Sequence, residues 1–206
     1  MLNITGDKLT YNYNMQNNKS KQSEKARIGA IGENLAIFEL MLHGWDAFNL
    51  NSTLKNYKDI DLVCIRKPED SYKPWKPQVS LIQVKTCMKT NIPIGFTLED
   101  CLNKEILEQN VIGPYVFIYI NKLEDYNTYR YFILSRKQFI ELAYQTNEYY
   151  VKRYHRNIEV NTKSPAGINV RWLEGQSENE TKKHGQFINP LHGVSCENRW
   201  ENIWED

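Results

Sequence analysis

VSLIQVKT, residues 79–86 of the 206-residue chain, is the stretch that decides the fold we expect. Its aliphatic and β-branched composition favours a β-strand. Side chains alternate between the two faces of a strand, so Gln83 and Lys85 share one face while Ile82 and Val84 share the other. Because polar groups within an apolar strand are costly unless they have partners, Gln83 and Lys85 are candidates for a functional site.

A second strand, expected at residues 59–66 and beginning with DIDLV (59–63), precedes the first one. The same alternation puts Asp59 and Asp61 on one face and Ile60 and Leu62 on the other. If the two strands pair, a carboxylate, an amide and an ammonium converge within a few ångströms. The alternative is that these Asp and Lys residues are solvated at a strand edge.

Such a group of side chains suits the hydrolysis of a phosphodiester. A hard divalent cation takes oxygen ligands, which Asp61 and the side-chain carbonyl of Gln83 can supply. The cation would polarise the phosphate and lower the pKa of a bound water. Lys85 could position or deprotonate that water, or neutralise charge that develops on the phosphate.

A helix is expected over residues 23–42, with Ser23 as its N-cap and Gly44 just beyond its end. Glu33 is the one ionisable group on a face that is otherwise small or aliphatic, made of Ala26, Gly29, Ala30, Ala36, Ile37 and Leu40. A second apolar stripe lies on roughly the opposite side and contains Ile28, Ile31, Leu35, Phe38 and Leu42. We therefore expect this helix to be buried on two sides. Glu33 is then either functional or part of a salt bridge inside the core.

The three segments occur in an order that resembles a known family. IGAIGENLA (residues 28–36), DIDLV (59–63) and IQVKT (82–86) are similar to the motifs of the PD-(D/E)xK nuclease superfamily. The likeness is greatest to its Holliday-junction-resolvase-like and Mrr-like restriction endonuclease branches, and it covers roughly residues 25–135. It implies an α/β fold with a restriction-endonuclease-like core, in which helices flank a central mixed β-sheet.

The resemblance also implies which residues form the active site. They are Glu33, Asp61, Gln83 and Lys85, with Glu33, Asp61 and Gln83 holding Mg²⁺, for which Mn²⁺ could substitute. Gln83 departs from the family because many members have an acid there, and this loss of a negative charge makes Glu33 more necessary. Ile60 also departs, since it stands where the family has Pro. Asp59 lies on the same face as Asp61 and is a possible additional metal ligand.

The rest of the chain completes the expected organisation. We divide it into a flexible N-terminal arm (1–22), a nuclease-like core (23–150) and a C-terminal extension that packs on the core (151–206). Further strands are expected at residues 45–50, 115–120 and 129–134. The strands at 45–50, 59–66 and 79–86, which are the first three along the chain, should form a meander. Helices are expected at residues 98–109 and, after a cap at Ser135, up to about residue 149. A short closing helix is expected at Trp200 and Trp204, because they are four residues apart.

Composition limits the ways in which the chain could bind nucleic acid. A net charge of +1 excludes a generic polycation, so binding to DNA would need a local basic patch. The first candidate is the run that contains Lys152, Arg153 and Arg156, and the second is the insertion that contains Lys73 and Lys76. A solvated helix end is an equally good interpretation of the first run.

The chain shows neither a signal peptide nor an apolar run of the roughly 20 residues that span a bilayer. Its four cysteines have no CxxC or other short metal-binding spacing, and Cys64 in its apolar run is expected to be a buried thiol. Cytoplasmic residence with reduced thiols and no contact with a membrane is the default expectation.

The function we expect is a Mg²⁺-dependent endonuclease that hydrolyses DNA, in a restriction, defence or repair setting. A homodimer is one expected arrangement, because a duplex cut needs two sites. The first alternative is a nucleic-acid-binding or interaction protein that keeps the fold without activity, for which the neutral Gln83 is the main reason. The second is a nuclease that acts on RNA or within a larger complex.

Overall fold

The computed structural model describes residues 6–52, 60–67, 77–122, 126–154, 161–177 and 187–204. Its centre is a five-stranded sheet with the order β1-β2-β3-β5-β6. Its strands are β1 (Asp46–Asn49), β2 (Leu62–Arg66), β3 (Gln78–Cys87), β5 (Tyr115–Lys122) and β6 (Asn127–Leu134). The strands β1, β2 and β3 pair antiparallel, β3 pairs parallel with β5, and β5 pairs antiparallel with β6. The expected meander and the mixed central sheet are both confirmed.

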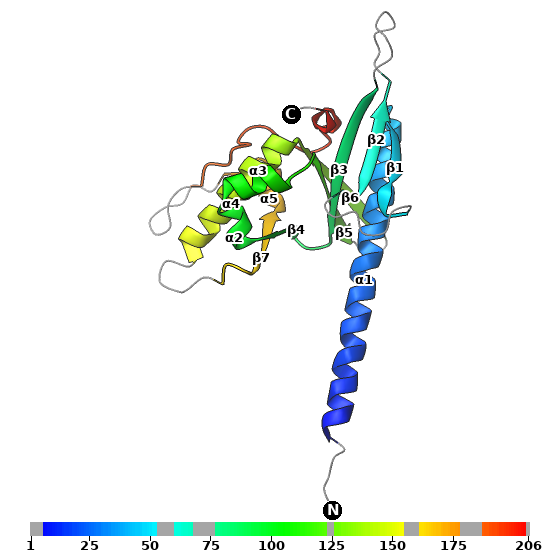
Figure 1. Cartoon of the computed structure of the whole chain (residues 1–206), viewed down its shortest axis with the longest axis vertical. Helices are drawn as coiled ribbons and strands as arrows, with labels where there is room; N and C mark the ends of the chain where they lie inside the picture. The colour runs from blue at the N-terminus through cyan, green and yellow to red at the C-terminus, as the bar shows by residue number, and fades with distance from the viewer. Residues whose placement is uncertain are drawn as a thin grey trace, which may run out of the picture.

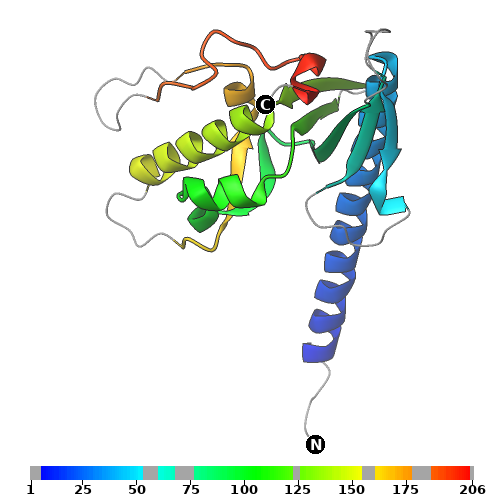
Figure 2. The ribbon, with the colours of Figure 1, turned by 45° about the horizontal axis from the view of Figure 1, so that its top comes forward.

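Helices cover both faces of this sheet (Figure 1). The long helix α1 (Gly6–Leu42) lies against one face and projects well beyond it, as Figure 2 also shows. The other side holds α2 (Leu98–Cys101), α3 (Lys104–Asn110), α4 (Arg136–Tyr154), α5 (Val170–Leu173) and a two-stranded sheet of β4 (Asn91–Thr97) and β7 (Pro165–Asn169). The molecule is therefore an α/β protein with a mixed five-stranded central sheet flanked by helices.

Alternation along the strands divides the interior into two apolar clusters. Val116 and Ile118 of β5 pack on the same side as Ala36 and Leu40 of α1. Their neighbour Phe117 packs on the other side, with the α4 residue Phe139 and others. Because both faces of β5 are covered, its apolar residues need not alternate with polar ones.

Most predicted elements are confirmed, with one helix divided. The helix expected at 98–109 is split into α2 and α3, because Asn103 caps α3 by accepting from the amides of Glu105 and Ile106. The Ser135 cap is confirmed, since Ser135 Oγ accepts from the amide of Gln138 at 3.3 Å. The strand β4 was not predicted.

Two predictions about α1 are wrong. The helix begins at Gly6 and not at Ser23, so most of the expected flexible arm, residues 1–22, is helical from Gly6 on. Neither Pro nor Gly occurs in residues 7–28, and nothing there forces the helix to end. The helix is also not buried on two sides, because Ile31, Phe38 and Leu42 of the second stripe are 41%, 59% and 66% exposed.

The described part of the C-terminal extension contacts the sheet at several points. The expected closing helix is a 3₁₀ turn, η2 (Trp200–Ile203), and Trp200 within it is buried. Ser80 Oγ of β3 donates to the backbone carbonyl of Ile203 at 2.8 Å, and Asn202 Nδ2 donates to that of Ile133 at 2.7 Å. These bonds place the end of the described chain beside β3 and β6.

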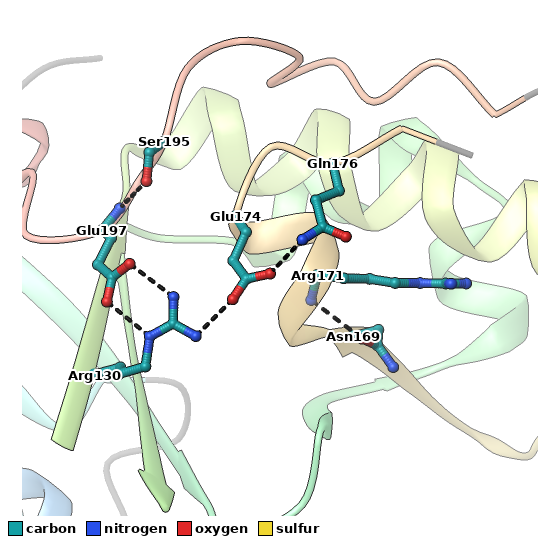
Figure 3. Close-up of polar contacts among 7 residues, drawn as sticks. All are labelled: Arg130, Asn169, Arg171, Glu174, Gln176, Ser195 and Glu197. Carbon is teal, nitrogen blue, oxygen red and sulfur yellow. Dashed lines mark hydrogen bonds and ion pairs between the residues drawn. The ribbon is translucent and has the colours of Figure 1, made fainter. Parts of the chain in front are cut away.

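An ion-pair cluster ties the same region to β6 (Figure 3). Arg130 donates to both carboxylate oxygens of Glu197, at 2.8 and 2.7 Å, and to Glu174 at 2.6 Å. The hydrogen bonds with Arg130 lower the pKa of Glu197 and raise that of the guanidinium. One side chain thus links β6, the end of α5 and the C-terminal segment.

The cysteines of the described chain are free thiols, and the expectation for Cys64 is confirmed. Cys64 is fully buried, and burial raises its pKa to about 12. Of the helices in the described ranges, none combines the length and the apolar character that crossing a membrane requires.

Candidate active site

Asp61 immediately precedes β2 and lies beside β3. Its backbone amide donates to the carbonyl of Ile82 at 2.9 Å, so pairing with β3 continues one residue beyond the bounds of β2. Its carboxylate Oδ2 accepts from Gln83 Nε2 at 2.5 Å and from the backbone amide of Val84 at 2.8 Å. The structure therefore brings together the first two residues that we expect in the site.

Gln83 is buried, and the two ends of its amide are in different situations. The nitrogen donates to Asp61, whereas Oε1 has no hydrogen-bond partner among the described residues. A buried carbonyl oxygen without a partner forfeits free energy on the order of 1–3 kcal/mol. A water molecule or a cation could supply the missing partner of this oxygen.

A close contact between α1 and β3 fixes the position of Glu33. A Cβ atom added to Gly32 would lie 1.6 Å from Thr86 Oγ1, so only glycine lets the helix approach the strand at this point. The next residue, Glu33, then reaches β1, where its Oε2 accepts from Asn49 Nδ2 at 2.6 Å.

Burial raises the pKa of Glu33 above its usual value, and it is the largest influence on that group. The hydrogen bond from Asn49 opposes this effect, whereas the charge of Asp61 adds to it. Lys85 lowers the pKa of Glu33 by a smaller amount. The two carboxylates and the ammonium therefore lie within electrostatic reach of one another.

Asn49 and Asn51 belong to the site and were not predicted. Asn51 Nδ2 donates to Asp61 Oδ1 at 3.3 Å, and the same side chain hydrogen-bonds to Glu33. It thus lies between the two carboxylates. Asn49 is the last residue of β1, and Asn51 follows two positions later. Their role depends on how β1 pairs with β2, so the sequence pattern did not reveal that role.

Lys85 shares a face of β3 with Gln83, as the alternation predicts, and it is half-buried. Its ammonium lies beside Gly95 of β4, because a Cβ added there would be 3.5 Å from Lys85 Nζ. Gly95 has a φ of +93°, a conformation that favours glycine. The small sheet β4–β7 therefore approaches the site through a residue that has no side chain.

The residues that could hold a cation are Asp61, Gln83 and Glu33. Within the described ranges, no three His, Cys, Asp or Glu residues form a metal-binding group, so the possible ligands are two carboxylates and an amide oxygen. These are oxygen donors, which fit Mg²⁺ or Mn²⁺ better than a softer metal. Asp59, the possible additional ligand, falls outside the described residues.

Of the five residues expected to bind nucleic acid, the two that the structure describes are not at this site. Lys152 pairs with Glu148 at 3.0 Å, and Arg153 donates to the Tyr149 hydroxyl at 3.1 Å. Both lie near the C-terminal end of α4, on the opposite side of the molecule from α1, β1 and β2 in Figures 1 and 2. Arg156, Lys73 and Lys76 lie outside the described residues.

A cavity in the described part of the molecule lies elsewhere. It has a volume of about 560 Å³ and lies between α4 and the β4–β7 sheet, with Asn91, Arg153, Asn169 and Arg171 in its lining. The residues that line this cavity do not include Asp61, Gln83, Glu33 or Lys85.

Comparisons of the chain with protein-family models, curated proteins and solved structures give no match. The functional argument consequently depends on the geometry of the site.

Proposed function

We propose that the protein is a metal-dependent nuclease with a restriction-endonuclease-like core, which hydrolyses DNA phosphodiester bonds with Mg²⁺. The observation that carries the proposal is Gln83 Oε1, a buried oxygen that lacks a hydrogen bond and is on the side chain that contacts Asp61. A hard cation would complete its coordination and would draw on the carboxylates of Asp61 and Glu33 as further ligands. The resemblance to PD-(D/E)xK nucleases supports the same assignment.

The three ligand residues come from separate elements, and each is held by the fold. The amide of Val84 fixes Asp61, and Asn49 fixes Glu33. The bound cation would supply Lewis acidity at the phosphate. Asp61 and Glu33 would hold the cation and thereby orient the substrate. A deprotonated Glu33 would add a negative charge to the metal site, which the neutral amide of Gln83 cannot do.

Lys85 would act on the substrate directly. Lys85 is a half-buried residue that shares a strand face with Gln83, and its charge is within electrostatic reach of Glu33. A positive charge there stabilises the extra negative charge that a phosphate gains as a nucleophile adds to it. The same group could hold the attacking water by a hydrogen bond.

The test is a cleavage assay with plasmid, linear, single-stranded and branched DNA in Mg²⁺ or Mn²⁺, with EDTA as the blank. We expect the parent chain to cut at least one substrate, and Lys85→Ala to lose at least about 100-fold in rate. Lys89→Ala is the matched control, because Lys89 is an exposed lysine just after β3, and it should retain activity. No cleavage by the parent with either metal would contradict the proposal.

One observation favours a second candidate, a nucleic-acid-binding protein without activity. Gln83 Nε2 and Asn51 Nδ2 both donate to Asp61, so the carboxylate is satisfied without a cation. Binding of the same DNA panel without cleavage in any metal would favour this candidate. Extension of the panel to structured RNA tests whether the substrate is RNA, and co-purification of a stoichiometric partner would support action within a complex.

A further inference from the structure

Part of the second apolar stripe of helix α1 is left uncovered by the described residues. Ile31, Phe38 and Leu42 are 41%, 59% and 66% exposed, and Met41 beside them is also exposed. Single exposed apolar residues are ordinary, but four on one helix form a patch that indicates an interaction surface.

The spacing of the stripe identifies the kind of partner that fits it. Ile28, Ile31, Leu35, Phe38 and Leu42 are separated by three, four, three and four residues, which is the heptad repeat of a coiled-coil seam. Ile28 and Leu35 are half-buried against the core on one edge of the stripe. The exposed residues of the stripe lie on the side of α1 away from those that pack on the sheet, such as Ala36 and Leu40, so a second helix can pack there without displacing the sheet.

The charges along α1 make the stripe complementary to itself when two copies run antiparallel. Residues 19–27 contain four Lys or Arg and one Glu, whereas residues 28–42 contain Glu33 and Glu39 and neither Lys nor Arg. An antiparallel pair places the basic part of one helix beside the acidic part of the other. A parallel pair would place the basic parts of the two helices side by side, and likewise the acidic parts.

We propose that the protein forms a homodimer through antiparallel pairing of α1, with the dyad at Glu33. In this register Ile28 lies opposite Phe38 of the second copy, and Ile31 lies opposite Leu35. Lys25 and Glu39 both occupy the e position of the heptad, beside the apolar seam. In this register Lys25 of each copy lies near Glu39 of the other. Because four apolar layers make a short seam, we expect the dimer to dissociate on dilution at micromolar concentrations.

The dimer itself does not depend on the proposed function, but it has a consequence for it. Glu33 is level with the dyad along the helix but lies on the face of α1 roughly opposite the stripe, so the two candidate sites would lie on the outer sides of the helix pair. The same axis would relate the two sites by two-fold symmetry.

Sedimentation velocity of the full chain without metal or nucleic acid, from low micromolar to submillimolar concentration, tests the pairing. We expect a dimer for the parent and a monomer for Ile31→Glu/Phe38→Glu, with the dissociation constant raised by about 100-fold or more and an unchanged circular dichroism spectrum. Ile188→Glu is the matched control, because Ile188 is 63% exposed but is not on α1, and it should remain dimeric. A parent that is monomeric throughout, or a dimer that persists in Ile31→Glu/Phe38→Glu, would overturn the proposal.

Charge reversal tests the antiparallel register without altering the apolar seam. Lys25→Glu and Glu39→Lys should each weaken the dimer several-fold, and the double variant Lys25→Glu/Glu39→Lys should restore the parent's affinity. A double variant at least as weak as the single ones would rule out this register. DNA cleavage is not part of either measurement, so failure of the dimer is distinguishable from failure of the nuclease proposal.

Discussion

At the scale of single residues, the neutral side chain of Gln83 avoids repulsion with the Asp61 carboxylate when no cation is bound. Gln83→Glu would place a second carboxylate against Asp61, at a contact that is now 2.5 Å between Gln83 Nε2 and Asp61 Oδ2. Mutual repulsion should lower the metal-free stability by about 1–3 kcal/mol, and added Mn²⁺ should restore more stability than it does in the parent.

Thermal unfolding in EDTA and in Mn²⁺ measures both effects of this substitution. Gln78→Glu is the control, because Gln78 is on the same strand but accepts a hydrogen bond from Arg66 Nε. That variant should show no added response to Mn²⁺. An equal response of the two variants would mean that no cation binds beside Asp61.

Glu33 makes the stability of the metal-free protein depend on pH, and its burial sets the direction of that dependence. Its pKa in the folded chain is raised above 4.5, so the folded state holds the proton more tightly than the unfolded state does. The stability due to this group is complete below pH 4.5 and is lost as the pH rises through the raised pKa. Glu33→Gln should flatten this fall while its amide oxygen still accepts from Asn49.

Urea unfolding in EDTA at a series of pH values above 4.5 measures the effect of Glu33. A variant that loses stability with pH as steeply as the parent would assign the fall to other groups. Cation binding should strengthen over the same range, because only the deprotonated carboxylate is a ligand.

At the scale of elements, a contact through glycine joins α1 to β3, and two glycines on the helix make a matched pair. Gly32→Ala would force its Cβ against Thr86 and should cost about 1–3 kcal/mol. Gly29→Ala meets nothing within 4 Å, so it should stabilise the protein by about 0.5–1 kcal/mol through helix propensity. The free energy of unfolding in urea compares the two variants. If they have equal effects, the close approach of the helix does not limit stability.

The sequence predicted best those strands in which the alternation of polar and apolar residues follows from the burial of one face. Strand alternation placed Asp61, Gln83 and Lys85 correctly relative to their apolar neighbours, because each face of the sheet packs against a different cluster. The strand β4 was missed since it contains Pro93 and Gly95, residues that are typical of edges and turns. It forms because β7 pairs with it from far along the chain.

Other features depend on contacts that no local pattern encodes. The amide of Asn51 bridges Glu33 and Asp61 only after α1, β1 and β2 have assembled. For α1, the periodicity identified the apolar stripe but not what covers it, so burial within the chain was expected where the structure shows exposure. An apolar stripe has the same spacing whether its partner belongs to the same chain or to another one.

At the scale of the whole molecule, Arg130 connects parts of the chain that are far apart in sequence. It binds Glu197 with two parallel hydrogen bonds and Glu174 with a third, and the three side chains are only partly exposed. Arg130→Lys keeps the charge but cannot form the paired contact, so we expect a loss of about 1–2 kcal/mol. Arg199→Lys is the control, because the Arg199–Glu201 pair is more exposed, and its loss should stay below about 0.5 kcal/mol.

The pH dependence separates the charge of the Arg130 cluster from its packing. The hydrogen bonds from Arg130 lower the pKa of Glu197 below 4.5, so the stability due to this group is present above pH 4.5 and is lost as the pH falls through the lowered pKa. Urea unfolding of the parent and of Arg130→Lys should therefore differ most near neutral pH and converge in acid. A difference that stays constant down to the acid limit would mean that Arg130 holds the C-terminal segment by packing on Phe132, whose ring lies 5.0 Å from the guanidinium carbon.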